Sequence, residues 1–398
     1  MDLSADSPTV GVVGGGQLGR MLAEAGSPLG VQLVVSDPTP DCPANHVARE
    51  QLVGAFDDGD TLRALAERAD VLTYEIELAD PDALDAVSEQ TGTPVHPAPD
   101  TLRTIQDKLV QNETFAEAGL PLPAFRRVDD ADDLRAAGEE LGWPVMVKAR
   151  TGGYDGRGNV PVDSPDEAET ALDEIGANNG GAVVEELVAF ERELAVIGAR
   201  GSDETVTFPV TETVQREEIL RESLSPARTD EETRERARAV ARSVLDELDG
   251  RGVFGIELFE REQEGGPNEI LLNEVAPRPH NSGHWSIEGC VTSQFEQHVR
   301  AVVGLPLGST RRRGPTASAN VLGEVAEPTR ARLTGVDEAL AATDAHLHWY
   351  GKREVRPLRK MGHVTAVGES EPPLSAVREA VETLGFAADR NGEEGRSR

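Results

Sequence analysis

The sequence predicts an α/β domain followed by a larger α+β region and a small C-terminal segment. Over residues 1–100, short apolar runs alternate with helical patterns, the order expected of parallel strands joined by helices. Over residues 101–310, strand-like runs often follow one another directly, which is typical of antiparallel sheet. Residues 311–390 form the smaller segment, and we expect residues 391–398 to be a disordered tail.

The first domain carries a glycine motif. A β-prone run, Thr9–Val13, leads into Gly14–Gly19, where glycines at 14, 16 and 19 open an amphipathic helix. This pattern is typical of turns whose backbone N–H groups approach a phosphate, although a purely structural turn is the alternative. Glu75 follows another strand, at the end where ligands bind in such sheets. The further strands predicted here are Val31–Ser36, Val71–Glu75 and Pro94–Pro97.

A second glycine-rich loop follows residue 150. A helix is expected from Asp100 to about Ala118, with Gln106 and Asp107 on its solvated face. A buried strand then ends at Lys148, and four glycines occur within the next ten residues. Such a loop between two strands predicts a flap that closes on phosphates, and the adjacent lysine favours this over a plain hairpin.

Two carboxylates interrupt apolar strands in the second region. Glu257 lies within Gly252–Phe259, and Glu274 ends the strand that begins at Ile270. A lone buried carboxylate is costly unless it binds a cation or a partner. We expect the two strands to be hairpin neighbours, so that both carboxylates face Mg²⁺ bridging ATP phosphates. The alternative is one exposed and one salt-bridged glutamate.

The stretch Asn273–His284 brings an amide, a carboxylate, a guanidinium and two imidazoles together after an apolar strand. Prolines and a glycine prevent a regular element from continuing through it. So many polar groups would make a poor core, and they indicate a functional site.

The remaining helices and strands of this region show weaker signals. Capping boxes at Ser164–Glu167 and Thr229–Glu232 predict helices reaching Ile175 and Leu248, the second with a solvated charged face. The further strands predicted here are Ala182–Glu186, Glu193–Ala199 and Val206–Pro209.

Composition excludes some partners. With 39 basic and 72 acidic residues, the net charge of −33 argues against nucleic acid and anionic membranes as partners. This acidity suits a protein that stays hydrated in concentrated salt, so we hypothesise a halophilic habitat. No apolar run is long enough to span a membrane and no signal peptide is recognisable, so we expect a cytoplasmic protein.

Basic residues are distributed unevenly. Only four of the 39 are lysines, and all four lie in stretches of interest: Lys108, Lys148, Lys352 and Lys360. A compact ammonium is therefore expected to matter at these positions. The cluster at residues 352–360 predicts an anion site, such as one for a sugar phosphate.

These stretches together resemble the N5-carboxyaminoimidazole ribonucleotide synthase family, ATP-grasp enzymes of purine biosynthesis. Matches in the same order over nearly the whole chain make the resemblance specific. The matching segments are Gly14–Arg20, Thr73–Glu77, Gln106–Lys108, Gly153–Asn159, Glu257–Phe259, Asn273–His284, Tyr350–Lys352 and Arg359–His363.

The resemblance implies three parts: a pre-ATP-grasp (Rossmann-like) domain over 1–100, an ATP-grasp domain over 101–310 and a small β-rich C-terminal domain over 311–390. It implies a ligase that converts ATP, bicarbonate and 5-amino-1-(5-phospho-D-ribosyl)imidazole (aminoimidazole ribonucleotide) into ADP, phosphate and N5-carboxyaminoimidazole ribonucleotide, through carboxyphosphate. Magnesium would accompany ATP, and the family is commonly dimeric, so we expect a homodimer.

The resemblance also implies roles for individual residues. Those that would hold ATP are Arg103, Lys148, Gly153, Tyr154, Asp155, Gly156, Arg157, Gly158, Asn159, Glu185, Glu186, Leu187, Val188, Glu193, Asn273 and Glu274. Those that would hold aminoimidazole ribonucleotide are Gln17, Leu18, Tyr154, Asp155, Lys352 and Arg359. The catalytic set, ordering bicarbonate and carboxyphosphate, would be Glu75, Tyr154, Arg157, Arg278, His280 and Asn281. Glu257 and Glu274 would bind magnesium.

The chain departs from the family at several positions. Thr213, Gln215 and Glu218 stand where the family usually has asparagine, histidine and glycine, Trp285 where a smaller or tyrosine side chain is common, and Asn159 where glutamine is common. Gln215 can hydrogen-bond a nucleotide but cannot become cationic, so its role toward ATP stays open.

Other functions fit parts of the sequence. The formate-dependent glycinamide ribonucleotide transformylase, a sister ATP-grasp enzyme, is the nearest alternative, but Asn281–His284 and Tyr350–Lys352 resemble the carboxylating family better. Residues 9–37 alone would fit an NAD-binding oxidoreductase, which leaves Glu257 and Glu274 unexplained. A non-catalytic nucleotide sensor is a further alternative.

Overall fold

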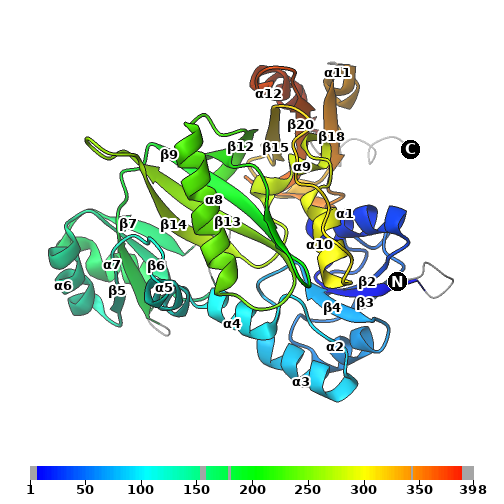
Figure 1. Ribbon diagram of the computed structural model, residues 1–398, viewed down its shortest axis with the longest axis horizontal. Helices are drawn as coiled ribbons and strands as arrows, with labels where there is room; N and C mark the ends of the chain where they lie inside the picture. Colours follow the sequence, from blue (N-terminus) through cyan, green and yellow to red (C-terminus); the bar gives the residue numbers. More distant parts are fainter. Residues whose placement is uncertain (1–6, 153–157, 178–180, 342–343, 388–398) are drawn as a thin grey trace, which may run out of the picture.

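The structure, a computed structural model, describes residues 7–152, 158–177, 181–341 and 344–387 (Figure 1). The N-terminal α/β domain, blue and cyan, lies on one side of a long central sheet. A smaller sheet packs at one end of the central sheet, and the C-terminal segment, orange and red, lies at the other end. No helix in the described ranges is both long enough and apolar enough to cross a membrane.

The N-terminal domain is built on a parallel sheet with strand order β3-β2-β1-β4. Its strands are β1 (Thr9–Val13), β2 (Gln32–Asp37), β3 (Glu50–Val53) and β4 (Val71–Tyr74). The helices beside it are α1 (Gln17–Gly26), the 3₁₀ turn η1 (Ser27–Leu29), α2 (Gly59–Ala66) and α3 (Pro81–Thr91).

In this domain one predicted strand is wrong and one strand was not predicted. Residues 94–97 make only an isolated bridge between Val95 and Leu72, because the prolines at 94 and 97 have no N–H for a ladder. The fourth strand is instead β3, whose half-exposed edge residues leave no apolar run to detect.

The helix expected over residues 100–118 is two helices. Asp107 separates α4 (Pro99–Gln106) from α5 (Lys108–Glu117) and caps α5, accepting hydrogen bonds from two of its backbone N–H groups. Its carboxylate also pairs with Arg150. Gln106 donates to the carbonyls of Glu77 and Ala79, each over 2.7 Å. Neither side chain belongs to a solvated face, contrary to the prediction.

The smaller sheet is antiparallel, in the order β5-β8-β6-β7. Its strands are β5 (Phe125–Val128), β8 (Ala182–Glu186), β6 (Val145–Ala149) and β7 (Asn159–Val162), and its helices are α6 (Ala131–Leu141), η2 (Pro165–Glu167) and α7 (Ala168–Glu174). The capping box predicted at Ser164–Glu167 is wrong. The Ser164 hydroxyl contacts the Glu167 carboxylate and accepts no backbone N–H of the helix.

The central sheet has nine antiparallel strands in the described chain. Their spatial order is β14 (Glu269–Ala276), β13 (Gly252–Arg261), β9 (Arg192–Arg200), β11 (Thr211–Arg216), β12 (Ile219–Ser225), β15 (Thr316–Leu322), β20 (Lys360–Val367) and β18 (Ala345–Trp349), with β10 (Thr205–Thr207) beside β9. The sheet therefore runs without interruption into the C-terminal segment.

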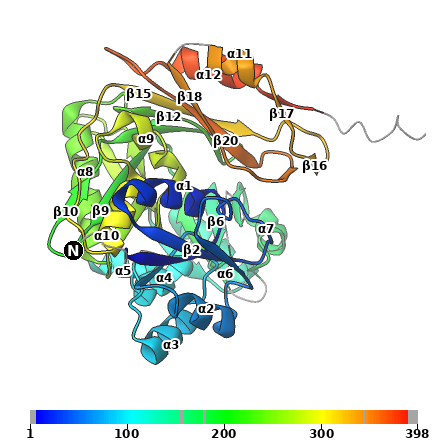
Figure 2. The ribbon, with the colours of Figure 1, turned by 90° about the vertical axis from the view of Figure 1, so that its right-hand side faces the viewer.

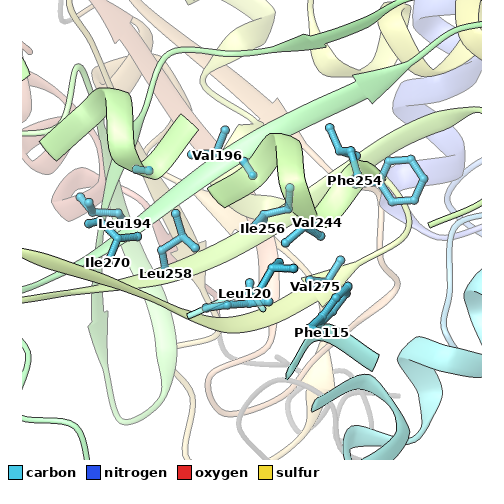
Figure 3. Close-up of a cluster of buried hydrophobic side chains, with 14 of the residues drawn as sticks. Phe115, Leu120, Leu194, Val196, Val244, Phe254, Ile256, Leu258, Ile270 and Val275 are labelled. Atoms are coloured by element: carbon cyan, nitrogen blue, oxygen red, sulfur yellow. The ribbon is translucent and has the colours of Figure 1, made fainter. Parts of the chain in front are cut away.

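Helix α8 (Glu231–Asp246) covers one end of this sheet over the largest apolar core (Figure 3). Ala237, Ala241 and Val244 recur at helical spacing and are fully buried, so one stripe faces β9, β13 and β14. Asp230 caps the helix, one residue after the predicted cap. The outer face carries Arg–Glu pairs, as expected of a solvated surface.

The sequence patterns did not predict β11 and β12 as strands. Their connection places Glu217 and Glu218 at φ of 52° and 59°, a left-handed conformation that favours glycine. This geometry gives a physical reason for the glycine that the family usually has at position 218.

The C-terminal segment, orange and red, lies along the upper edge of the molecule in Figure 2, with α1 below it. The remaining elements before and within it are η4 (Asn281–Gly283), α9 (Ser286–Gly289), α10 (Gln294–Val302), β16 (Thr329–Arg330), β17 (Leu333–Thr334), α11 (Val336–Ala341), β19 (Glu354–Val355), α12 (Leu374–Thr383) and β21 (Gly385–Phe386). Helix α12 packs on β15 and β20. The tail predicted over 391–398 lies outside the described residues.

Candidate active site

Strands β13 and β14 place Glu257 directly opposite Glu274, so the prediction that these residues are hairpin neighbours is confirmed. The register then shifts: Leu258 pairs with Leu272, and Asn273 is the extra residue of a β-bulge. In a regular strand, Asn273 and Glu274 would point to opposite faces. Here both accept hydrogen bonds from lysines of the same cluster. The bulge brings the two side chains to one site.

Those two lysines come from separate elements, and each pairs with a carboxylate. Lys108, at the start of α5, donates from Nζ to Glu274 Oε1 over 2.8 Å. Lys148, on β6, has its Nζ 2.7 Å from Glu185 Oε2 and 3.1 Å from Asn273 Oδ1. We call these five residues, Lys108, Lys148, Glu185, Asn273 and Glu274, the lysine network.

The carboxylates around this network differ in acidity. Burial, reinforced by the charges of Glu274 and Glu193, raises the pKa of Glu257 to about 8. Burial also raises the pKa of Glu193 to about 7. The Lys108 ammonium instead lowers the pKa of Glu274 to about 2. At neutral pH, Glu274 is therefore ionised while Glu257 retains its proton.

The opposed carboxylates Glu257 and Glu274 have the chemistry of a divalent-cation site, because hard cations prefer oxygen ligands. Within the described ranges, however, no group of three or more His, Cys, Asp or Glu side chains is arranged to hold a metal ion. A cation between Glu257 and Glu274 would thus take its other ligands from a bound substrate or water.

Past β14 the chain enters a second cluster. Arg278 pairs with Glu77 over 3.0 Å, while its Nε is buried without a hydrogen-bond partner among the described residues. His280 Nδ1 lies 2.9 Å from Ser282 Oγ and 3.9 Å from Glu257 Oε1. Asn281 Nδ2 is likewise buried without a partner in the described chain. Unpaired buried donors indicate a ligand with acceptor oxygens.

Glu75 reaches the same region from the N-terminal domain and accounts for the glycine motif. Its carboxylate accepts the N–H groups of Gly16 and Gly19 over 2.5 and 3.2 Å. Burial raises the pKa of Glu75 to about 7, against the opposing effects of these N–H groups and of Arg278. Gly14 has a φ of 103°, and a Cβ there would lie 2.6 Å from Glu75 Cγ, so this position of the motif favours glycine.

Because Glu75 uses the donors that a dinucleotide phosphate would need, the loop does not support an NAD site. We call Glu75, Arg278, His280 and Asn281 the loop site.

The C-terminal segment packs against α1, because Tyr350 lies in one core cluster with Leu18 and Met21 of that helix. Arg353 pairs with Asp41 of the N-terminal domain over 2.8 Å. Lys352 Nζ donates to the Lys360 carbonyl over 2.7 Å, and Arg359 donates to the Glu354 carbonyl over 2.8 Å. On the α1 side, Gln17 is half-buried and begins the helix.

Several predicted nucleotide residues lie elsewhere or carry other contacts. Arg103 is 42% exposed on α4 and pairs with Asp82, Asp85 and Asp100, so the structure does not bring it into the lysine network. Glu186 pairs with Arg261 over 3.0 Å. Leu18 and Val188 are buried, Leu187 is exposed, and Gly158 and Asn159 lie at the start of β7. Gly153, Tyr154, Asp155, Gly156 and Arg157 lie outside the described residues.

Lys108 is the network member that the predicted binding set lacked. The scarcity of lysine marked Lys108 as a position where an ammonium matters, but this signal did not assign Lys108 to the nucleotide. The bulge at Asn273 left no such signal.

Comparisons with known proteins cover nearly the whole chain. Residues 8–106 match the ribonucleotide synthetase preATP-grasp domain, residues 113–295 the ATP-grasp domain, and residues 316–376 the phosphoribosylaminoimidazole carboxylase C-terminal domain. The expected three-part fold is thereby confirmed.

The names of two similar proteins agree with this domain assignment. The N5-carboxyaminoimidazole ribonucleotide synthase of Brucella melitensis is 40% identical over 370 residues, 92% of this chain and 99% of the relative. The chloroplastic phosphoribosylaminoimidazole carboxylase of Vigna aconitifolia is 43% identical over 365 residues. This chain spans only 64% of the length of that plant protein.

Two solved structures have closely similar folds. The N5-carboxyaminoimidazole ribonucleotide synthetase from Thermotoga maritima has a TM-score of 0.85 at 41% identity, covering 96% of this chain and 100% of its own. The Aspergillus clavatus N5-carboxyaminoimidazole synthase, solved with ADP and 5-aminoimidazole ribonucleotide, has a TM-score of 0.85 at 34% identity, covering 95% of this chain and 98% of its own.

Proposed function

Because this chain belongs to the N5-carboxyaminoimidazole ribonucleotide synthase family of ATP-grasp ligases, we propose that it carboxylates aminoimidazole ribonucleotide with bicarbonate at the expense of ATP. The observation that carries the proposal is that one continuous chain segment, strand β14 and the residues after it, contributes to both clusters. Strand β14 contributes Asn273 and Glu274 to the lysine network, and the chain then supplies Arg278, His280 and Asn281 to the loop site. Two substrates can thus meet along one segment.

The chemistry needs such a meeting point. Bicarbonate is a poor electrophile, so one of its oxygens first attacks the γ-phosphorus of ATP, releasing ADP and forming carboxyphosphate. Cleavage of the carbon–oxygen bond then gives phosphate and CO₂. The substrate amine forms the new nitrogen–carbon bond with CO₂ and loses a proton. Positioning and charge neutralisation supply most of the catalysis in such a sequence.

In this proposal the lysine network holds the polyphosphate. Lys148 and Lys108 offer two ammonium groups, and Glu193, Glu185 and the 186–188 segment would contact the rest of ATP, as expected from the family resemblance. The residues of the 153–157 flap, including Tyr154, Asp155 and Arg157, keep their expected roles. Arg103 is excluded from this set because its guanidinium is already paired with surface carboxylates.

Magnesium is proposed at Glu257 and Glu274. Support comes from their direct cross-strand pairing, because Mg²⁺ between them would replace the proton that Glu257 otherwise holds and would balance both negative charges. Mg²⁺ there would neutralise charge on the phosphates during transfer. The two carboxylates alone are a weak site, so metal and nucleotide should bind together.

The loop site is proposed for bicarbonate and carboxyphosphate. Arg278 Nε and Asn281 Nδ2 are buried donors without partners in the described chain, which supports an anion beside them. Gln17, the backbone at Leu18, Lys352 and Arg359 would hold aminoimidazole ribonucleotide and its phosphate. Support comes from Tyr350 of the C-terminal segment, which shares a core cluster with Leu18 and Met21 of α1.

Further expectations rest on the sequence and the resemblance. We propose domain boundaries near 100 and 310, a homodimer and a cytoplasmic location, although a plant relative is named as chloroplastic. Light scattering tests the dimer.

The net charge of −33 supports a halophilic protein. Melting in dilute buffer and in molar KCl tests this, and greater stability in dilute buffer would reject it.

A coupled ATPase assay in molar KCl tests the function. We expect ADP release that requires both aminoimidazole ribonucleotide and bicarbonate. Turnover that required formate and glycinamide ribonucleotide instead would overturn the proposal in favour of the transformylase.

A further inference from the structure

Helix α10 carries three buried polar side chains on one face. Gln294, Gln297 and His298 are each fully buried, and their spacing places them on the same side of the helix. This helix packs against α1, β9 and β13, between the N-terminal domain and the central sheet (Figure 2). Polar groups at such a position need specific partners.

Gln294 binds the backbone of His280 with both ends of its amide. Its Oε1 accepts the His280 N–H over 2.9 Å, and its Nε2 donates to the His280 carbonyl over 2.7 Å. The same Nε2 lies 3.1 Å from His284 Nδ1. Both backbone polar groups of residue 280 are therefore fixed by one side chain.

The surroundings hold Gln294 in place. Its own backbone N–H donates to Ser286 Oγ over 3.0 Å, and that hydroxyl donates to the Gly283 carbonyl over 2.6 Å. A Cβ on Gly283 would lie only 2.5 Å from Gln294 Oε1. The amide and the 280–286 turn therefore have little freedom to shift relative to each other.

His298 connects the same helix to the strands that carry the other site residues. Its Nε2 lies 2.8 Å from Thr73 Oγ1. Thr73 is on β4, and Glu75 follows directly after that strand. Its Nδ1 accepts the Val253 N–H over 3.1 Å, near the start of the strand that carries Glu257. Helix α10 thus touches the three segments that deliver Glu75, Glu257 and His280.

Gln297 provides a natural comparison. Its amide makes the same two-bond pair with Gly308, donating to the carbonyl over 2.6 Å and accepting the N–H over 2.8 Å. Gly308 lies in the connection to the C-terminal segment and belongs to neither the lysine network nor the loop site. The two glutamines match in burial, helix and main-chain bonding, and differ in the segment that they hold and in the additional contact of Gln294 with His284.

We propose that Gln294 is a positioning residue for the carboxylation, which fixes the His280 main chain so that its imidazole meets the substrate anion beside Glu257. The inference rests on the proposed function, in which His280 orders bicarbonate. Its physical basis is that a displacement of about 1 Å in a reacting geometry can cost about 100-fold in rate. Gln294 touches no substrate in this account and acts only through His280.

Gln294→Met and Gln297→Met test the proposal, because methionine keeps the length of the side chain and removes both hydrogen bonds to the main chain. We expect similar losses in melting temperature. Only Gln294→Met should lose kcat for the N5-carboxylated product, by about 10- to 100-fold, with KM for ATP within about threefold of the original chain. ATP consumed per product formed should rise, since the lysine network is intact and misplaced carboxyphosphate decomposes.

Gln294→Glu is the rescue variant. A protonated glutamate offers one acceptor and one donor at the same length, so its kcat should lie between those of Gln294→Met and the original chain. Equal kcat values for Gln294→Met and Gln297→Met would overturn the inference, as would a Gln294→Glu variant no better than Gln294→Met. Failure of the proposed function is distinguishable, because the unmodified chain would then show no turnover dependent on aminoimidazole ribonucleotide.

Discussion

The lysine network and the loop site hold most of their functional groups in different ways, although the loop site also contains the ion pair between Arg278 and Glu77. In the lysine network, side chains pair with one another: Lys108 with Glu274, and Lys148 with Glu185. In the loop site, the main chain does much of this work, since Glu75 accepts backbone N–H groups and Gln294 holds the backbone of His280. Side-chain pairs can exchange partners when a ligand arrives, whereas main-chain contacts fix geometry beforehand. We infer that the lysine network rearranges when a ligand binds and that the geometry of the loop site is set before binding.

Glu274→Gln should impair the lysine network more than any other change considered below. The change removes the charge that opposes Glu257 and receives Lys108, so ATP turnover should fall on the order of 10²- to 10³-fold. Glu269→Gln is the matched control, because Glu269 lies on the same strand but pairs with Arg261 outside the network. ADP release measures both. Undiminished turnover by Glu274→Gln would contradict the magnesium assignment.

Lys108→Met tests whether partners exchange. If the ammonium moves from Glu274 to the phosphates, its loss should weaken binding of the magnesium–nucleotide complex by roughly tenfold. Lys108→Arg keeps the charge and should lose less. Calorimetric titration with ADP and Mg²⁺ gives both affinities. Tighter binding by Lys108→Met would mean that Lys108 merely occupies the cation position.

Glu75→Gln tests the loop site through the pH dependence of the free energy of unfolding. The pKa of Glu75 is raised from 4.5 to about 7 in the fold. Between these values only the folded protein holds the proton, so the stability that Glu75 contributes is present below 4.5 and lost as pH rises through 7.

From about pH 5 to about pH 8, the free energy of unfolding should therefore shift in favour of Glu75→Gln over the original chain, on the order of 2 kcal/mol. Urea unfolding at both pH values measures the shift. A difference between the two proteins that did not change with pH would show that Glu75 has an ordinary pKa.

Arg103→Gln should have the smallest effect. This guanidinium lies on α4 with three surface carboxylates, so KM for ATP should change by less than about twofold. A tenfold rise in KM would restore Arg103 to the nucleotide site that the sequence had suggested. Steady-state kinetics beside Lys108→Met gives the contrast directly.

The sequence predicted features that depend on pattern and missed those that depend on local register. Alternation and motif order predicted the three parts, and two acid-bearing strands predicted the Glu257–Glu274 pairing. One inserted residue at Asn273 changes which face a side chain takes, and no residue type marks it. Glu75 reveals a related limit, because a glycine motif does not say whether its N–H groups meet a ligand or the protein itself.

The transfer of an oxygen atom tests most directly the central claim that bicarbonate and ATP react with each other on this protein. If bicarbonate attacks ATP as proposed, one oxygen from ¹⁸O-labelled bicarbonate must appear in the phosphate that is released with each N5-carboxylated product. Mass spectrometry of the phosphate detects it. We predict one labelled oxygen per phosphate, and phosphate without label would contradict the account.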